Sequence, residues 1–449
     1  MKKVAIFILR NNQLRNFLPV IKEMLLSGRI VPVLITTKTM NIGIRAAQNY
    51  DPALNPFHDQ MEVHYIEHID EISALLERLD IKVLFSNIIL PFLSNLDYEN
   101  NSGSGLLRRL KEKGIKYILL QYCTEEVANL PKLFSRESLD LVSGFLCQSQ
   151  YWLESMVEAF ARQLKLSEED ILGIRNKSFV VGWAELDGVK GLDKEAILGK
   201  YGLKKGKKIV FFDPVGNVNH VPNFLYKYHF CMSQTGKKKL LRMLRNLSGD
   251  IWISPGMLWK LPSYLKALIA YRKVPNYEAL FFNLQKFCKE NDYLLICKSR
   301  EKNNDGDFIK SGCDLYTYDR SYLPFTLLEL LSISNVYVGF NSFSTVEAAY
   351  FRLPVLSINI FLAKYEFREY GGKAYQYIEE CFDTPGEWLN FPGVNQVYRL
   401  YRDRIDFAKA ISGLKTNPQS QDEYIAKFIG SEDGKSSKRI LDVIEEKFL

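Results

Sequence analysis

The sequence predicts two doubly wound α/β domains, because short apolar runs alternate with helical patterns along both halves of the chain. A length of 449 residues fits two domains. In the first half, the runs predict strands at 3–9, 31–35, 63–66, 82–85, 117–120, 145–147 and 179–181, with helices such as 17–26, 72–79 and 106–113 between them. In the second half, strands are predicted at 208–212, 293–297, 315–318, 336–338 and 355–358.

The domain boundaries follow from glycine content. Glycines crowd among Lys and Asp residues at Gly182, Gly188, Gly191, Gly202 and Gly206 and indicate an exposed connection. We therefore predict an N-terminal domain over 1–185, a C-terminal domain over 186–420 and a closing segment over 421–449. Ligands of doubly wound sheets bind outside the carboxyl ends of the strands. The loops at 10–16, 86–96 and 122–130 are therefore expected to line a cleft.

The composition of the chain narrows the class of protein to which it can belong. Hydrophobic residues make up 47% of the chain, enough for a core in each half, and the 7 cysteines show no CxxC spacing that would indicate a zinc or redox pair. Arg10 interrupts the apolar start and no cleavage site follows, so a first strand is expected rather than a signal peptide. No apolar stretch approaches the roughly 20 residues that span a bilayer. We expect a cytoplasmic protein, with a peripheral membrane location as an alternative.

The stretch 335–359 predicts a strand, a tight turn, a helix and a second strand. Ser344 and Glu347 are spaced as in a capping box, and Pro354 ends the helix pattern. Free backbone N–H groups and the helix dipole make such a helix start a natural anion site. The alternative is that the two side chains only cap the helix.

The segment STVEAAYFRLPVL resembles the S/T-x-x-E-A-A-x-x-G-x-P segment of GT-B glycosyltransferases. The resemblance implies that this loop binds a nucleotide diphosphate and that Glu347 binds the ribose. The other nucleotide-binding residues that it implies are Asn341, Ser342, Ser344 and Thr345. Arg352 stands where that family usually has Gly.

The end of the chain carries a second resemblance. Its run DGKSSKRI is similar to the D-G-K-[AS]-[ST]-x-R-[IV] run of sugar-nucleotide 2-epimerases and CDP-glycerol-type polyol-phosphate transferases. The matching positions are Asp433, Gly434, Lys435, Ser436, Arg439 and Ile440. The resemblance implies that this run starts the final helix, which in GT-B proteins often packs back on the first domain.

Two cations at the end of the second strand of the C-terminal domain, Lys298 and Arg300, are candidates to neutralise a leaving diphosphate. A surface salt bridge is the alternative. Asp305-Gly306-Asp307 has a DxD spelling, but its polar surroundings are also those of an ordinary turn. We therefore expect no metal ion and no resident cofactor.

Candidates for acid–base chemistry are fewer. Glu125 and Glu126 follow the strand at 117–120, where a carboxylate could deprotonate an acceptor hydroxyl. His220 follows the first strand of the second domain and could act as a base or bind phosphate, and Asp97 is a weaker rival. A structural role remains an alternative for each. Arg10, Asn11, Asn12 and Arg15 replace a glycine-rich loop and suit a polar or acidic acceptor.

A long insertion of about 219–290 separates the first two strands of the second domain. Residues 226–273 hold ten basic residues and one acid, a net charge of +9, interleaved with aromatic residues such as Trp252 and Trp259. This mixture suits an anionic membrane surface. A solvated basic face is the main alternative, and nucleic-acid binding is disfavoured because no nucleic-acid fold is recognisable.

The prediction is therefore a GT-B-like fold of two Rossmann-type domains facing a cleft. Its predicted function is metal-independent transfer of a sugar from a nucleotide-activated donor to a lipid-linked or surface-polysaccharide acceptor, as in bacterial capsule or lipopolysaccharide synthesis. The alternatives are a CDP-glycerol-type polyol-phosphate transferase, a hydrolysing UDP-sugar 2-epimerase, or a non-catalytic membrane-associated binding module.

Overall fold

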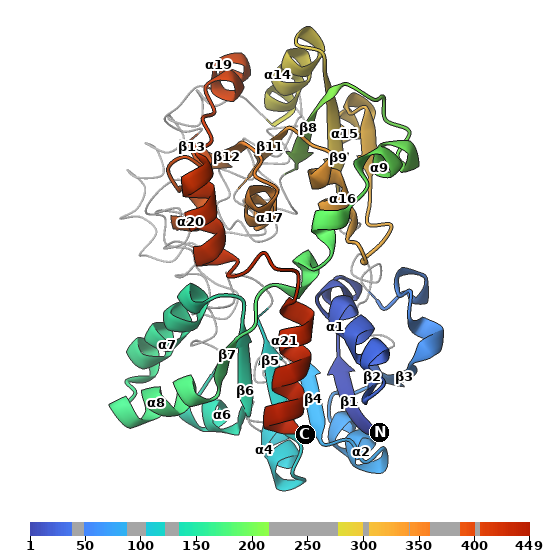
Figure 1. Cartoon of the computed structure of the whole chain (residues 1–449), viewed down its shortest axis with the longest axis vertical. Helices are drawn as coiled ribbons and strands as arrows, with labels where there is room; N and C mark the ends of the chain where they lie inside the picture. Colours follow the sequence, from blue (N-terminus) through green and yellow to red (C-terminus); the bar gives the residue numbers. More distant parts are fainter. Residues whose placement is uncertain are drawn as a thin grey trace, which may run out of the picture. The chain divides into compact units, whose positions relative to one another are not determined.

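The structure, a computed structural model of the chain, describes residues 1–37, 49–87, 105–121, 134–214, 277–299, 305–340, 342–359, 387–399 and 405–449 (Figure 1). The chain forms two compact units. Unit 1 comprises Met1–Ile197, Tyr318–Ile333 and Gln421–Leu449, and unit 2 comprises Leu198–Thr317 and Ser334–Ser420. The domain bounds expected from the sequence stay a prediction.

Unit 1 is built on a seven-stranded parallel sheet of order β3-β2-β1-β4-β5-β6-β7. Each strand lies where an apolar run predicts it. Their bounds are β1 Lys2–Phe7, β2 Ile30–Thr37, β3 Glu62–Ile66, β4 Val83–Ser86, β5 Lys116–Leu120, β6 Gly144–Cys147 and β7 Ser178–Val180. The central strands are buried on both faces, as expected of a sheet covered by helices on each side.

Helices pack on this sheet, and the final helix α21 lies beside α1 (Figure 1). The α-helices of unit 1 are α1 Leu14–Ser27, α2 Glu71–Arg78, α4 Gly105–Glu112, α6 Arg136–Leu141, α7 Gln150–Leu164, α8 Glu168–Asn176, α16 Thr326–Ser332 and α21 Ser436–Val443, which is followed by the π-helix η9 Ile444–Phe448. Short 3₁₀ turns are η1 Asn11–Gln13, η3 Pro52–Leu54, η4 His58–Gln60, η5 Ala184–Leu186 and η6 Val189–Gly191. As the resemblance of the tail implies, the DGKSSKRI run begins the last α-helix.

The start of α1 differs from the prediction of a polar loop up to residue 16. The side-chain oxygen of Gln13 accepts hydrogen bonds from the backbone N–H groups of Leu9 and Arg10, at 2.8 and 2.9 Å. This bridge tightens residues 11–13 into a 3₁₀ turn, so the helix begins at Leu14. A local side-chain bond to the backbone thus replaces the loop that composition alone indicated.

Unit 2 holds a six-stranded parallel sheet of order β10-β9-β8-β11-β12-β13. The strands are β8 Lys208–Asp213, β9 Tyr293–Lys298, β10 Leu315–Thr317, β11 Val336–Gly339, β12 Val355–Asn359 and β13 Asn395–Arg399. The sequence predicted all but β13. Helices of this unit are α14 Tyr277–Glu290, α15 Asp307–Gly312, α17 Ser344–Tyr350 and α19 Phe407–Ser412, with the 3₁₀ turn η8 Glu387–Leu389. The chain passes from one unit to the other within two helices, α9 Lys194–Lys200 and α20 Pro418–Phe428.

One face of this second sheet forms an apolar core with α14 and α19, to which Val210, Phe212, Val338 and Leu356 contribute. Side chains alternate between the two faces of a strand. Phe211, Asp213 and Tyr337 therefore belong to the opposite face, and α17 contacts that sheet at β11 and β12. The polar side chains of Asp213 and Tyr337 therefore lie on the face of the sheet that α17 covers.

The strand order of each sheet reverses once. In unit 1 the reversal lies between β1 and β4, and in unit 2 between β8 and β11. Open α/β sheets bind ligands outside the carboxyl ends of the strands at such a switch point. Each unit therefore has one position where its topology favours a site.

The expectation of an exposed connection after β7 is wrong for its first part. Trp183, Glu185, Leu186 and Val189 are all at most 5% exposed. The turn η5 packs against α1, so the chain here belongs to the core of unit 1. From Lys190 to the end of α9 most residues are exposed, although Ile197 is buried. No helix in the described ranges combines the length and apolar character needed to cross a membrane.

Candidate functional site

A polar cluster lies at the switch point of unit 2, built around Tyr337 of β11. The ring of Tyr337 is fully buried and stacks on Phe211 of the neighbouring strand, with centroids 5.8 Å apart. Its hydroxyl donates a 2.7 Å hydrogen bond to the carboxylate of Asp213 at the end of β8. Burial raises the pKa of Tyr337 well above its ordinary value and the nearby Asp213 raises it further, so the phenol stays protonated and holds the carboxylate in place.

Gly339, the last residue of β11, leaves room for this cluster. A Cβ atom at Gly339 would lie 2.4 Å from the hydroxyl oxygen of Tyr337 and 2.7 Å from its ring. Because any side chain would displace the phenol, glycine at this position is required by the Tyr337–Asp213 pair. Neither Asp213 nor Tyr337 was singled out from the sequence.

The turn between β11 and α17 differs from the predicted capping box. Helix α17 begins at Ser344, and the preceding Phe343 has helical dihedrals and makes no side-chain cap. The hydroxyl of Ser342 instead lies 3.4 Å from the N–H of Ser344, and the Ser342 carbonyl accepts the N–H of Thr345 at 3.0 Å. The capping role of Ser344 and Glu347 is therefore wrong, because the helix starts one residue earlier than that motif requires.

Glu347 is 2% exposed and comes close enough to Tyr337 to raise the pKa of that phenol. Ser344 and Thr345 are also buried, and Ser342 is half-buried. The structure thus gathers Ser342, Thr345 and Glu347 in one turn and helix beside the Tyr337–Asp213 pair. Their predicted roles in holding phosphate and ribose stay predictions.

Arg352, which stands in place of the family's glycine, has a φ of +58°. Its N–H bonds to the carbonyl of Ala349 at 2.9 Å, and Leu353 bonds back to Ala348 at 3.2 Å, so the helix closes with a left-handed residue. Arg352 thus adopts a left-handed backbone conformation, which glycine adopts without steric cost.

At the end of β9, Lys298 is 7% exposed. The next residue, Ser299, donates a hydrogen bond to the carboxylate of Asp305, which also accepts one from Tyr316 at 3.0 Å. Burial raises the pKa of Asp305, and the two hydroxyl donors partly offset that shift. The side chain of Asp307, by contrast, is fully exposed. The two carboxylates of the DxD spelling therefore sit in different surroundings, and Asp305 ties the loop after β9 to β10.

Several candidates predicted from the sequence lie outside the described residues. These are Asp97, Glu125, Glu126, His220, Arg300, Asn341 and the basic stretch 226–273. Within the described ranges, no cluster of three or more His, Cys, Asp or Glu side chains is arranged to hold a metal ion. A groove of about 240 Å³ lies beside Pro354 and Val394, at the amino ends of β12 and β13, and is therefore at the edge opposite to the switch point.

The switch point of unit 1 holds a second buried network. Glu185 accepts a hydrogen bond from Asn16 of α1, and its other oxygen lies 3.2 Å from Nε of Arg15. Asn16 in turn accepts a 3.0 Å hydrogen bond from Asn87, which directly follows β4. Burial raises the pKa of Glu185, whereas Arg15 lowers it. This network fixes the end of β4 to the first turn of α1.

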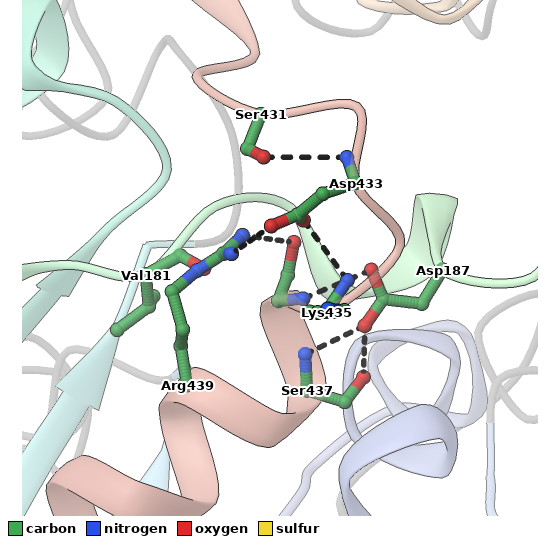
Figure 2. A network of polar contacts seen from close by, with 8 residues as sticks. Val181, Asp187, Ser431, Asp433, Lys435, Ser437 and Arg439 are labelled. Carbon is green, nitrogen blue, oxygen red and sulfur yellow. Dashed lines mark hydrogen bonds and ion pairs between the residues drawn. The ribbon is translucent and has the colours of Figure 1, made fainter.

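A third network fastens the tail (Figure 2). The carboxylate of Asp187 accepts the backbone N–H groups of Ser436 and Ser437 at 3.1 and 2.6 Å, and also the Ser437 hydroxyl at 2.6 Å. Arg439 donates to the carbonyl of Val181 at 2.8 Å and to Asp433 at 2.6 Å. The DGKSSKRI run is thus explained as an anchor for the last helix rather than as part of a ligand site.

No family model and no curated protein matches this chain. Solved structures do match it over almost its whole length. UDP-GlcNAc 2-epimerase from Neisseria meningitidis, solved with UDP-GlcNAc bound, aligns with a TM-score of 0.51 at 10% identity over 99% of this chain and 100% of the other. A variant of the wall teichoic acid polymerase TagF aligns with a TM-score of 0.51 at 12% identity over 100% of this chain and 89% of the other.

These matches and the two parallel sheets show a GT-B-like fold, as the sequence predicted. At this level of identity the likeness defines the architecture of the chain. Its activity has to be argued from the residues at the two switch points.

Proposed function

We propose that the protein is a metal-independent glycosyltransferase that takes a sugar from a nucleotide-activated donor bound by unit 2. The observation that carries this proposal is the set of side chains at the β8/β11 switch point. Lys298 supplies a cation at the end of β9, Ser342 supplies a hydroxyl, and Glu347 supplies a buried carboxylate. A cation suits a diphosphate, and carboxylate oxygens suit the paired hydroxyls of a ribose.

The acceptor binds unit 1 in this proposal, and the base that deprotonates its hydroxyl is Glu125, Glu126 or His220. The acceptor is a surface-polysaccharide or lipid-linked intermediate, because the basic stretch 226–273 suits an anionic bilayer. Sedimentation with liposomes tests this part: binding that is equal on neutral and anionic vesicles, or insensitive to salt, contradicts it.

A second candidate is a polyol-phosphate transferase of the CDP-glycerol type. The architecture shared with TagF and the DGKSSKRI run favour it. A hydrolysing 2-epimerase is the third, favoured by the match to the Neisseria enzyme. A thermal-shift series with UDP, CMP, CDP, GDP and ADP separates the donors, because a ligand that binds only the folded state raises the melting temperature. Product analysis with the matching activated sugar then separates transfer from epimerisation.

Glu347→Gln is the sharpest test of the nucleotide site. A hydrogen bond to a charged group contributes about 1.5–3 kcal/mol, so nucleotide affinity should fall about tenfold or more. Glu290→Gln is the control, because Glu290 is an exposed carboxylate on α14 of the same unit and lies outside the proposed site. Calorimetry on both variants measures the effect. Unchanged affinity in a folded Glu347→Gln protein would remove the ribose contact and with it the proposed site.

A further inference from the structure

Three consecutive strands of unit 1 end in carboxamide side chains that are buried and incompletely bonded. Asn87 follows β4, Gln121 follows β5 and Gln148 follows β6, and they are 1%, 7% and 2% exposed. Among the described residues, Asn87 Oδ1, Gln121 Nε2 and Gln148 Oε1 have no hydrogen-bond partner. Leaving such a group buried and unbonded costs about 1–3 kcal/mol, so three of them at one edge of a sheet require an explanation.

The orientation of the Asn87 amide is fixed by its neighbours. The Glu185 carboxylate accepts the NH₂ group of Asn16, so the Asn16 oxygen faces Asn87 and accepts the NH₂ group of Asn87. The side-chain oxygen of Asn87 is therefore left without a hydrogen-bond donor among the described residues.

The orientation of the Gln121 amide is also fixed, but here, within the described ranges, the oxygen is bonded and the NH₂ group is not. Its side-chain oxygen accepts the backbone N–H of Gln148 at 2.9 Å. The NH₂ group of Gln121 is therefore the part left over, and it needs an acceptor. Gln148 adds a second oxygen that needs a donor.

This pattern selects a chemical class of ligand. A carboxylate or a phosphate-ester anion offers acceptors only and leaves the two oxygens unbonded. Free hydrogen phosphate offers a single O–H group for the two oxygens, and a metal cation leaves the NH₂ group unbonded. A hydroxyl group both donates and accepts. Neutral strand ends of this kind therefore match a neutral ligand that carries several hydroxyl groups.

We propose that the carboxyl ends of β4, β5 and β6 form a binding site for a neutral, hydroxyl-rich group, a sugar or polyol, with Asn87, Gln121 and Gln148 as its hydrogen-bonding residues. This inference rests on the proposed function, for which it defines the chemistry of the acceptor site in unit 1. The three strand ends span about 10 Å, twice the spacing of neighbouring strands, so one or two sugar rings cover them. The site begins at the β1/β4 switch point, where the topology favours a ligand.

The test measures the binding of N-acetylglucosamine and maltose to the full chain by ligand-observed NMR, with inorganic phosphate as the anionic comparison. Gln148→Met keeps the side-chain volume and removes the unbonded oxygen, and Gln121→Met removes the unbonded NH₂ group together with the oxygen that accepts the Gln148 N–H. Each should weaken saccharide binding about two- to tenfold, the value of one neutral hydrogen bond. Gln150→Met is the matched control, because Gln150 is exposed two residues along the chain. It should leave binding unchanged.

Saccharide affinity that is the same in Gln148→Met, Gln121→Met and the control would overturn the proposal, since water then completes these amides. Absence of any saccharide binding, or tighter binding of phosphate that depends on Gln121, would overturn it as well. Nucleotide binding is measured on the same samples. A protein that binds nucleotide but no saccharide contradicts this inference alone, whereas a protein that binds no nucleotide contradicts the proposed function.

Discussion

Removal of the Asp187 carboxylate should destabilise unit 1 strongly, because one side chain caps the last helix from a distant part of the chain. Helix α21 has no capping side chain of its own at Lys435. The carboxylate of Asp187 bonds instead to the first two N–H groups of the helix and to the Ser437 hydroxyl. Asp187 thus joins the segment after β7 to the tail.

The magnitude follows from these contacts. Loss of a helix cap costs about 0.5–2 kcal/mol, and hydrogen bonds to a charged group are worth about 1.5–3 kcal/mol each, without being additive. Asp187→Ala should therefore lower the free energy of unfolding by about 3 kcal/mol. Asp187→Asn keeps an oxygen acceptor but loses the charge that favours a helix N-terminus, and should cost about 1–2 kcal/mol.

Equilibrium urea unfolding of the full chain, followed by the fluorescence of the buried Trp152 and Trp183, measures the effect. The control is Asp442→Asn on the same helix. Asp442 forms an exposed i,i+4 ion pair with Lys438, and such a pair contributes about 0.3–0.5 kcal/mol. If Asp187→Ala and Asp442→Asn shift the transition equally, the cap contributes nothing and the reasoning about the tail fails.

Three further predictions concern single residues. Arg439 lowers the pKa of Asp433 to about 2, so this carboxyl stabilises the folded state above about pH 4 and loses that contribution as the pH falls toward 2; acid unfolding of Asp433→Asn should lack this component, and curves that stay parallel would contradict it. In urea titrations, Arg352→Gly should have a free energy of unfolding about 0.5–1 kcal/mol higher than that of Arg352→Ala. Both variants lose the same side chain, whereas the left-handed φ costs alanine about 1–2 kcal/mol and the chain entropy of glycine offsets part of that difference; equal values would contradict this reasoning. Lys298→Ala should weaken calorimetric binding of the preferred nucleoside diphosphate about tenfold and leave the nucleoside unaffected, and equal losses for both ligands would argue against a phosphate contact.

The strands were predictable because buried parallel strands are nearly continuous apolar runs, and β1 and β8 show this plainly. The strand β13 was not predicted, because it has no apolar run. Its sequence NQVYR is mostly polar, and the strand lies at the edge of its sheet, where only one neighbour has to be satisfied. Apolar content therefore predicts the central strands and also the edge strands β3, β7 and β10, but it misses the polar edge strand β13.

The polar clusters could not be predicted, because they join residues that no local pattern relates. Asp213 and Tyr337 are 124 residues apart, and Asn16 and Glu185 are 169 apart. The one local feature that could have indicated the cluster was Gly339, a glycine at the end of an apolar run. Its role became evident only when the Tyr337 hydroxyl was found in the space where a Cβ atom would lie.

The two sheets have the same kind of switch point but present different chemistry there. In unit 2 the strand ends carry ionisable groups, Lys298 and Asp213, with Glu347 close by, which suits a ligand with phosphates and ribose hydroxyls. In unit 1 the strand ends carry the amides Asn87, Gln121 and Gln148, and the Nε atom of the nearby Arg15 lies 3.2 Å from the carboxyl group of Glu185. A buried amide discriminates against anions that cannot donate a hydrogen bond, whereas a lysine attracts them. Under the proposed function, this contrast assigns a neutral hydroxyl-bearing group to unit 1 and a charged nucleotide to unit 2, because exchanging the two ligand classes would leave both sets of polar side chains unsatisfied.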